Sequence, residues 1–215
     1  MMTTKTTASR ARGAIFAAAT VAATLALAGC ASSPTRFYTL SAPPAAIPAV
    51  AQNAKLFIEV SPIALPERLA RPQLVVRSSG ANAGTRVDIL EQERWSSPFN
   101  NELRDALASA IASRLGATDV SRSGRPTDQP VYRIAIELRE FDAAPGDKVQ
   151  ATYGWTVTRS DNAKTSACQL TVAEPVAAGI DALVLGVQRT VADAAGAIAA
   201  SVGTFKNGAA PACQG

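Results

Sequence analysis

Three cysteines and the absence of histidine limit the chemistry open to this chain. The 215-residue sequence contains Cys30, Cys168 and Cys213 and no histidine. The usual general base of nucleophilic hydrolases is therefore missing, and so is the commonest ligand of catalytic zinc. The sequence also lacks a Gly-x-Ser-x-Gly elbow and a carboxylate pair whose spacing indicates acid–base catalysis. We expect no enzymatic activity, no bound metal and no cofactor.

Cys30 ends an apolar segment of the kind that directs export. The chain opens with three cations and no acidic residue, namely Lys5, Arg10 and Arg12. An uncharged, Ala-rich run of 15 residues follows over 14–28, which is shorter than the ~20 residues of a membrane-spanning helix. The tetrapeptide that ends at Cys30 is Leu-Ala-Gly-Cys, the lipobox pattern of bacterial lipoproteins. We expect a signal peptide over 1–29 and a diacylglycerol thioether on Cys30.

An ordinary secretory signal is the alternative for this segment. Cleavage would then fall near Ala28 or Ala31, and Cys30 would be incidental. In the lipoprotein interpretation at least two acyl chains, each contributing ~0.8 kcal/mol per buried methylene, make attachment effectively permanent. Ala31 stands where an aspartate would retain many lipoproteins at the inner membrane. The outer membrane, with the domain in the periplasm, is thus the expected location, although sorting to the inner membrane stays open.

Removal of the signal peptide also changes the charge of the chain. The whole sequence has a net charge of +4 and a pI near 9.2. Because 1–29 carries three cations and no anion, the chain from Cys30 onward has a net charge of +1. No basic run remains that could bind phosphates, so we expect no nucleic-acid partner.

The two remaining thiols are candidates for a disulfide. In an oxidising compartment Cys168 and Cys213 would close a loop of 44 intervening residues, worth ~4 kcal/mol in the chain-entropy model. Such a bond would hold the C-terminal tail against the sheet. Two unpaired thiols are the alternative.

Composition and hydrophobic periodicity divide the mature chain into a tether, a domain and a tail. Residues 30–53 form the lipidated N-terminus and a Pro/Ala-rich tether, 54–205 the domain, and 206–215 the tail. Alternating apolar residues predict a strand near 56–60, a hairpin from 71–79 and 84–92, and a three-stranded meander over 131–141, 148–158 and 165–174.

Two amphipathic helices complete the predicted domain. The first has Ser97 as N-cap, Pro98 at its first position and Gly116 as its stop, and the second runs over 180–202. Trp95 and Trp155 are expected in the core, because large aromatic side chains dominate core packing. The predicted fold is α+β, a two-layer sandwich of a largely antiparallel sheet with two main helices packed on it.

Two further segments are candidates for contacts with partners. Residues 65–72 predict a stiff, exposed loop whose partner-binding candidates are Pro66, Glu67, Arg68, Arg71 and Pro72. A solvated connection is the alternative. The segment 36–40, Arg-Phe-Tyr-Thr-Leu, follows the lipobox cysteine closely. It would complete the fold as an edge strand or contact lipid.

Several motifs in order resemble the ABC-type transport auxiliary lipoproteins, the PqiC-like lipoproteins of MCE transport systems. They are the segment 36–40 after the lipobox, "LPERLARPQLVVR" at 65–77, Arg94-Trp95 before the first helix, and the meander followed by a terminal helix. The resemblance implies a lipoprotein in the inner leaflet of the outer membrane that docks an MCE-domain protein and its ABC transporter. It also implies a homo-oligomer and a non-enzymatic role in moving lipid between membranes. A structural or assembly lipoprotein that binds another envelope protein or a polysaccharide is the alternative, and an envelope hydrolase is the third.

Overall fold

The computed structural model of the chain describes residues 33–41, 56–78, 84–209 and 213. The chain divides into Met1–Pro34 and Thr35–Gly215, and the fold below is that of the second part. Its elements, in chain order, are β1 (Arg36–Tyr38), β2 (Phe57–Val60), the 3-10 turn η2 (Glu67–Leu69), β3 (Gln73–Arg77), β4 (Val87–Trp95), α2 (Phe99–Leu115), β5 (Thr118–Asp119), β6 (Val131–Ala143), β7 (Lys148–Arg159), β8 (Thr165–Pro175) and α3 (Ile180–Lys206). Two long helices together with two β-sheets confirm the predicted α+β class.

A five-stranded sheet in the order β5-β2-β6-β7-β8 is the larger of the two sheets. Strands β6, β7 and β8 pair antiparallel in sequence, which confirms the predicted meander. Strand β2 instead pairs parallel with β6 on one side and with β5 on the other. The sheet is therefore mixed. The parallel pairing of β2 with β6 is possible because α2 lies between the two strands in the sequence and returns the chain to the same end of the sheet.

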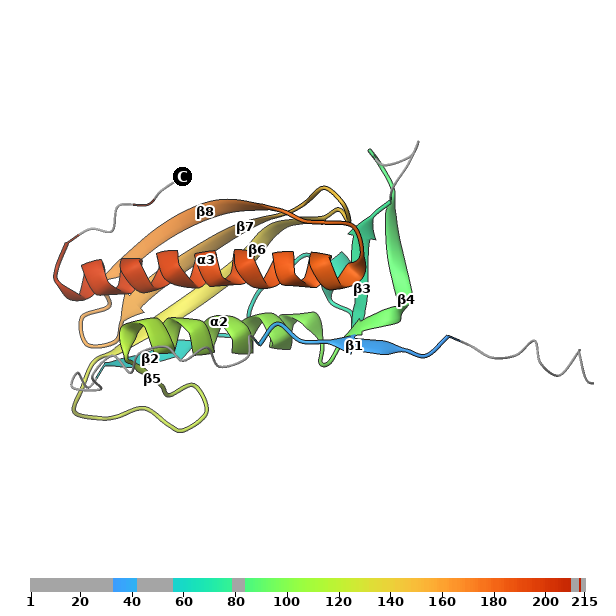
Figure 1. The fold of residues 1–215 in the computed structure, drawn as a ribbon. Coiled ribbons are helices and arrows are strands. Elements are labelled where there is room, and N and C mark those ends of the chain that lie inside the picture. The colour runs from blue at the N-terminus through green and yellow to red at the C-terminus, as the bar shows by residue number, and fades with distance from the viewer. Residues whose placement is uncertain (1–32, 42–55, 79–83, 210–212, 214–215) are drawn as a thin grey trace, which may run out of the picture. The chain divides into compact units, whose positions relative to one another are not determined.

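Both helices cover one face of this sheet, with α3 lying along the strands and α2 beside it (Figure 1). The core between the layers is apolar, since alternate residues of β7 face the helices. Val149, Ala151 and Val157 are fully buried there, as are Leu107 of α2 and Ile198 of α3. Trp95 and Trp155 are each only 5% exposed, as the sequence predicted.

Helix α3 is long and apolar enough to span a membrane by length and composition, with a mean hydropathy of 1.2 in its best window. In the fold, however, 56% of that window is buried. Its apolar stripe packs on α2, β7 and β8, while Asp181, Arg189 and Asp193 stay exposed on the other side. The helix therefore serves as the core helix of this domain.

A separate three-stranded sheet, in the order β1-β4-β3, lies at one end of the domain. We call it the small sheet. Strands β3 and β4 form the predicted antiparallel hairpin, and β1 adds to β4 in parallel. The sequence pattern predicted these strands but not their separation from the large sheet, because alternation reveals the buried face of a strand and not its neighbour.

The start of α2 differs from the prediction by one residue. Pro98 has extended backbone angles (φ −50°, ψ 136°) and precedes the first helical residue, Phe99. Ser97 does not cap the helix; its hydroxyl donates to the carboxylate of Glu102 instead, at 3.0 Å. The predicted stop is confirmed, because Gly116 adopts the left-handed conformation (φ 60°) that glycine tolerates best.

Candidate functional site

The lipidation candidate Cys30 lies outside the described residues. The first described strand after it is β1, which connects this end of the chain to the domain. Strand β1 begins at Arg36, six positions after Cys30. Its three residues pair with Glu93, Arg94 and Trp95 of β4. The first three residues of the segment 36–40 thus form an edge strand of the small sheet, which was one of the two roles expected from the sequence.

Side chains at the start of β1 strengthen this pairing. The Arg36 guanidinium forms an ion pair with Glu93, with Nε donating to Oε1 at 3.0 Å. Thr35 donates its hydroxyl to Gln92 at 2.8 Å. Both interactions are exposed, so each contributes little to stability, because water and salt screen exposed ion pairs and compete for exposed hydrogen bonds. They set the register of β1 more than they stabilise it.

Glu102, in the first turn of α2, provides the stronger attachment. Its side chain is buried, with 8% exposure, and accepts hydrogen bonds from two directions. Oε2 accepts from the Thr39 hydroxyl at 2.9 Å and from the Leu40 backbone N–H at 3.0 Å. Oε1 accepts from Ser96 at 2.6 Å and from Ser97 at 3.0 Å. We call this arrangement the Glu102 clamp, because it ties the segment after β1 to the start of α2.

The hydrogen bonds of the clamp also keep Glu102 ionised. Burial by itself would raise the pKa of this carboxyl, but the donors from Ser96, Leu40, Thr39 and Ser97 outweigh burial and lower the pKa. A negative charge near the positive end of a helix is favourable as well. A further bond, from Gln188 Nε2 of α3 to the Thr39 carbonyl at 3.0 Å, holds the same segment from the other helix.

Tyr38 lies on the core-facing side of β1, next to Trp95 of β4. Burial, followed by the carboxylates of Glu93 and Asp181, raises the pKa of its phenol. The phenol therefore stays protonated at every physiological pH. Tyr38 packs against the core, whereas its neighbour Phe37 is 66% exposed.

The loop predicted to bind partners turns through η2 at the edge of the small sheet. Leu69 is its buried anchor, with 4% exposure. Arg68 donates to the Phe141 carbonyl at 3.4 Å, and Arg71 Nε donates to the Arg68 carbonyl at 2.9 Å. Of the five candidates, Glu67, Arg68 and Pro72 are exposed and Pro66 and Arg71 are half-buried. The loop is thus ordered and three of its candidate side chains are accessible.

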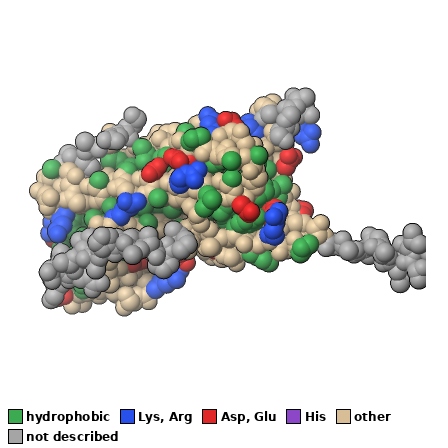
Figure 2. Space-filling view, viewed as in Figure 1, with side chains coloured by type: hydrophobic (Ala, Val, Ile, Leu, Met, Phe, Trp, Pro, Cys, Tyr) green, Lys and Arg blue, Asp and Glu red, His purple; other side chains and the backbone are tan. Residues whose placement is uncertain are grey.

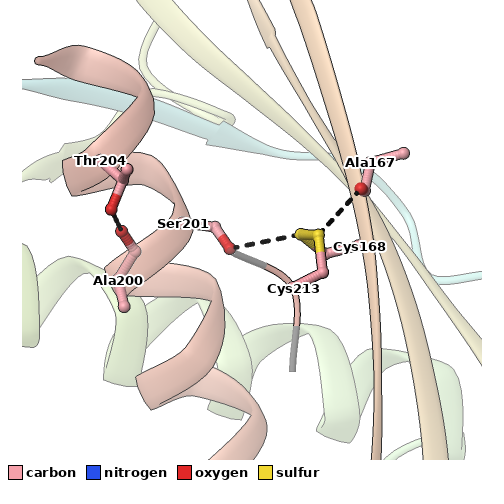
Figure 3. Close-up of a disulfide and its surroundings, with 6 residues drawn as sticks. All are labelled: Ala167, Cys168, Ala200, Ser201, Thr204 and Cys213. Carbon is pink, nitrogen blue, oxygen red and sulfur yellow. Dashed lines mark hydrogen bonds between the residues drawn. A yellow bond between two sulfur atoms is a disulfide. The ribbon is translucent and has the colours of Figure 1, made fainter. Parts of the chain in front are cut away.

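A disulfide joins Cys168 of β8 to Cys213 of the tail, with the two Cα atoms 5.2 Å apart (Figure 3). The Ser201 hydroxyl of α3 lies 3.9 Å from the Cys168 sulfur. The Cys213 sulfur lies 3.2 Å from the Ala167 carbonyl oxygen. In this structure the bond links the tail to the last strand beside the end of α3.

Two cavities in the described part of the chain are both smaller than a binding pocket for a drug-sized ligand. One, of about 10 Å³, lies under the small sheet between Leu69, Trp95, Phe99 and Leu183 and has room for roughly one water molecule. Another, of about 210 Å³, lies beyond the end of α3 and includes Arg159. Binding pockets for drug-sized ligands measure about 300 to 1,000 Å³. Among the described residues no group of three or more His, Cys, Asp or Glu side chains could hold a metal ion.

Comparison with solved structures places this fold among α+β domains that have been seen before. A crystal structure described as an uncharacterized protein matches 79% of this chain and 99% of its own length, with a TM-score of 0.62 and 18% identity. The crystal structure of a Xanthomonas campestris protein of family DUF330 matches 80% of this chain and 98% of its own, with a TM-score of 0.62 and 16% identity. At these identities the likeness concerns the fold alone.

A family model decides the assignment. Residues 38–199, from β1 into α3, match the model of the ABC-type transport auxiliary lipoprotein component. The chain belongs to this family, which confirms the resemblance seen in the sequence. A comparison with curated proteins gives no match. The family is one of envelope lipoproteins that assist transporters, and it is not a family of known enzymes.

Proposed function

We propose that this chain is a periplasmic lipoprotein, anchored by Cys30 in the outer membrane, that docks the conduit of an ABC/MCE-type lipid transport system at that membrane. The observation that carries the proposal is the family match over 38–199. The lipobox at Cys30 supports the anchor, and Ala31 supports the outer membrane. The role is non-enzymatic and needs no cofactor.

The geometry favours docking over carrying. A protein that carried a phospholipid would need a cavity of several hundred Å³, and the two cavities described above measure about 10 and 210 Å³. Lipid would therefore pass through the partner, and this domain would hold the partner at the membrane. The exposed Glu67, Arg68 and Pro72 of the η2 loop are the proposed contacts, because loops fixed to a rigid scaffold commonly carry binding residues.

Affinity purification of the full-length chain from native membranes tests this function. An MCE-domain protein and its transporter should be recovered with the wild type. The Arg68→Glu variant should reduce recovery about tenfold, the effect of losing ~1.4 kcal/mol of binding free energy. Lys206→Glu is the matched control, since Lys206 is also exposed but lies at the end of α3. Recovery of an unrelated envelope protein in place of a transporter would reject the proposal.

A further inference from the structure

The outer face of the small sheet exposes apolar side chains. Four large apolar residues stand out among the described ones: Phe37 (66% exposed), Val87 (56%), Leu185 (54%) and Ile89 (42%). Leu185 belongs to α3, and the other three belong to strands β1 and β4 of the small sheet. Figure 2 shows hydrophobic side chains among charged ones over the end of the domain where β1 lies.

Alternation along the strands places these three side chains on one face. Successive residues of a strand project to opposite sides, and alternate residues to the same side. Phe37 and Ile89 are each followed by a residue that packs against the core, namely Tyr38 and Leu90, so Phe37 and Ile89 both point away from the core. Val87 lies two positions before Ile89 and shares its side; the register of β3 and β4 is regular here and shifts only between Gln73 and Leu74.

Residues of β3 lie opposite these residues of β4. Val75 is opposite Ile89, and Arg77 is opposite Val87. The reverse face carries Leu74, Val76 and Leu90, which pack against the core. Val75 is half-buried and also packs against the core, so we call the set Phe37, Val87 and Ile89 the apolar sheet face.

The charges around the apolar sheet face are compensated by ion pairs. Arg77 pairs with Asp142 at 2.6 Å, and Arg94 lies 3.9 Å from Glu91. Attraction between this face and a charged surface is therefore weak, and its apolar side chains dominate what it can bind.

The length of chain before β1 indicates what covers this face. Phe37 lies seven positions after Cys30, and an extended chain spans at most ~3.6 Å per residue, which limits the distance to ~25 Å. The lipid headgroup layer is itself about 5 to 7 Å thick on each side of the hydrocarbon. An acyl anchor on Cys30 would therefore hold Phe37 of β1 within ~25 Å of the anchored end of the chain at the bilayer, whatever path the chain takes.

We propose that the apolar sheet face rests on the lipid bilayer that holds the anchor, with Phe37, Val87 and Ile89 entering the headgroup layer. This contact rests on the Cys30 anchor of the proposed function. It gives the domain a second attachment and fixes its orientation, because a domain held only by its N-terminus can rotate freely. Aromatic and aliphatic side chains favour this depth in other interfacial proteins.

Fluorescence quenching in vesicles tests the contact. The full-length lipidated chain is reconstituted in phosphatidylethanolamine/phosphatidylglycerol vesicles whose acyl chains are brominated, and acylation is first verified by mass spectrometry. We expect the emission added by Phe37→Trp to be reduced about twofold or more, as for a side chain ~5 to 10 Å deep in the interface. Because the side chains carry the contact, quenching should be the same at low and high salt.

Ala200→Trp is the matched control. Ala200 is exposed on α3 and lies about 30 Å along the helix from Ile180 at ~1.5 Å per residue. Its added emission should not be quenched. Ile89→Trp supplies the same measurement from β4 if the first variant disturbs β1, and should also be quenched.

The outcomes separate this inference from the proposed function. Quenching of Phe37→Trp and Ile89→Trp without recovery of any transporter would support the contact and reject the transport role. Unquenched emission in both variants overturns the contact with the bilayer. If Phe37→Asp then also abolishes recovery of the transporter, the apolar sheet face binds protein instead of lipid. An unacylated Cys30 overturns both the contact and the anchor.

Discussion

Glu102 is the residue on which the attachment of β1 depends most. Its carboxylate accepts from Thr39 and Leu40, which lie more than 60 positions earlier in the chain. The sequence analysis assigned the nearby Ser97 to a helix cap and did not predict these contacts of Glu102. No local pattern could have revealed the clamp, since half of its donors are distant in sequence.

Removing the charge of Glu102 should destabilise the domain. In Glu102→Gln the amide cannot accept from all four donors, and a lost hydrogen bond to a charged group costs about 1.5 to 3 kcal/mol. We expect the free energy of unfolding to fall by about 2 to 3 kcal/mol in urea titrations. Glu91→Gln, at a side chain that is 65% exposed, should change it by less than about 0.5 kcal/mol. Equal effects in the two variants would contradict the clamp.

The lowered pKa of Glu102 also predicts how stability depends on pH. A group whose pKa is lower in the folded state stabilises the fold above its ordinary pKa, near 4.5, and this contribution is lost as pH falls through the lowered value. Glu59, whose pKa is lowered by a hydrogen bond from Arg125, acts in the same direction.

We therefore expect the free energy of unfolding to decrease as the pH is lowered below about 4.5. Each such carboxyl contributes at most ~1.4 kcal/mol per pH unit. The slope should be shallower in Glu102→Gln than in the wild type when urea titrations are repeated across the acidic range. An unchanged slope would show that Glu102 titrates alike in the folded and unfolded states.

At the scale of elements, apolar periodicity predicted where the helices and strands lie, but it did not predict which strands pair. The meander, the β3–β4 hairpin and both helices were predicted from apolar spacing, and all are present. The parallel insertion of β2 beside β6 was not predicted. Parallel strands are joined by a long connection, so the partner of a strand lies far away in the sequence and cannot be identified from the residues of the strand itself.

Close packing of α3 against the loop after β8 can be tested at two glycines of the helix. A Cβ added at Gly186 would overlap Val176 Cγ1 and approach Val149 Cγ2 to 3.1 Å. At Gly203 it would meet nothing within 4 Å. Gly186→Ala should therefore cost about 1 to 3 kcal/mol by overpacking. Gly203→Ala should gain about 0.5 to 1 kcal/mol from helix propensity. Thermal unfolding measures both, and a stabilised Gly186→Ala would contradict the tight contact.

The disulfide should stabilise the domain through its unfolded state. The two cysteines are 45 positions apart, and closing a loop of that size contributes ~4 kcal/mol in the chain-entropy model. Cys213→Ser should lower the midpoint of thermal unfolding in non-reducing buffer, and added reductant should lower the wild type to a similar midpoint. If reductant leaves the wild type unchanged, Cys168 and Cys213 are not paired in the protein.

At the scale of the whole molecule, the candidate site combines the proposed anchor at Cys30, which a sequence pattern predicts, with an apolar face that no sequence pattern predicts. The lipobox and the exposed η2 loop were predicted from residue types. The apolar sheet face was not, because its members, Phe37, Val87 and Ile89, come from two strands that are distant in the sequence. Only the register of the small sheet brings them together.

A longer tether should weaken both membrane contact and docking without releasing the protein. Ten Gly/Ser residues inserted after Ala31 would extend the reach from Cys30 to Phe37 from ~25 Å to as much as ~60 Å. Membrane fractionation should still recover the chain with the membrane, while transporter recovery and quenching of Phe37→Trp fall. A ten-residue insertion after Gly208, on the tail side of α3, is the control. Full recovery with the long tether would show that height above the bilayer is unimportant.

The disulfide fixes an order of events during biogenesis. Cys213 comes after every strand and helix that the structure describes, and synthesis proceeds from the N-terminus. Oxidation must therefore wait until β8 and α3 have both been delivered to the oxidising side. The crosslink therefore forms late in export, after the strands and helices that precede Cys213 have entered the oxidising compartment.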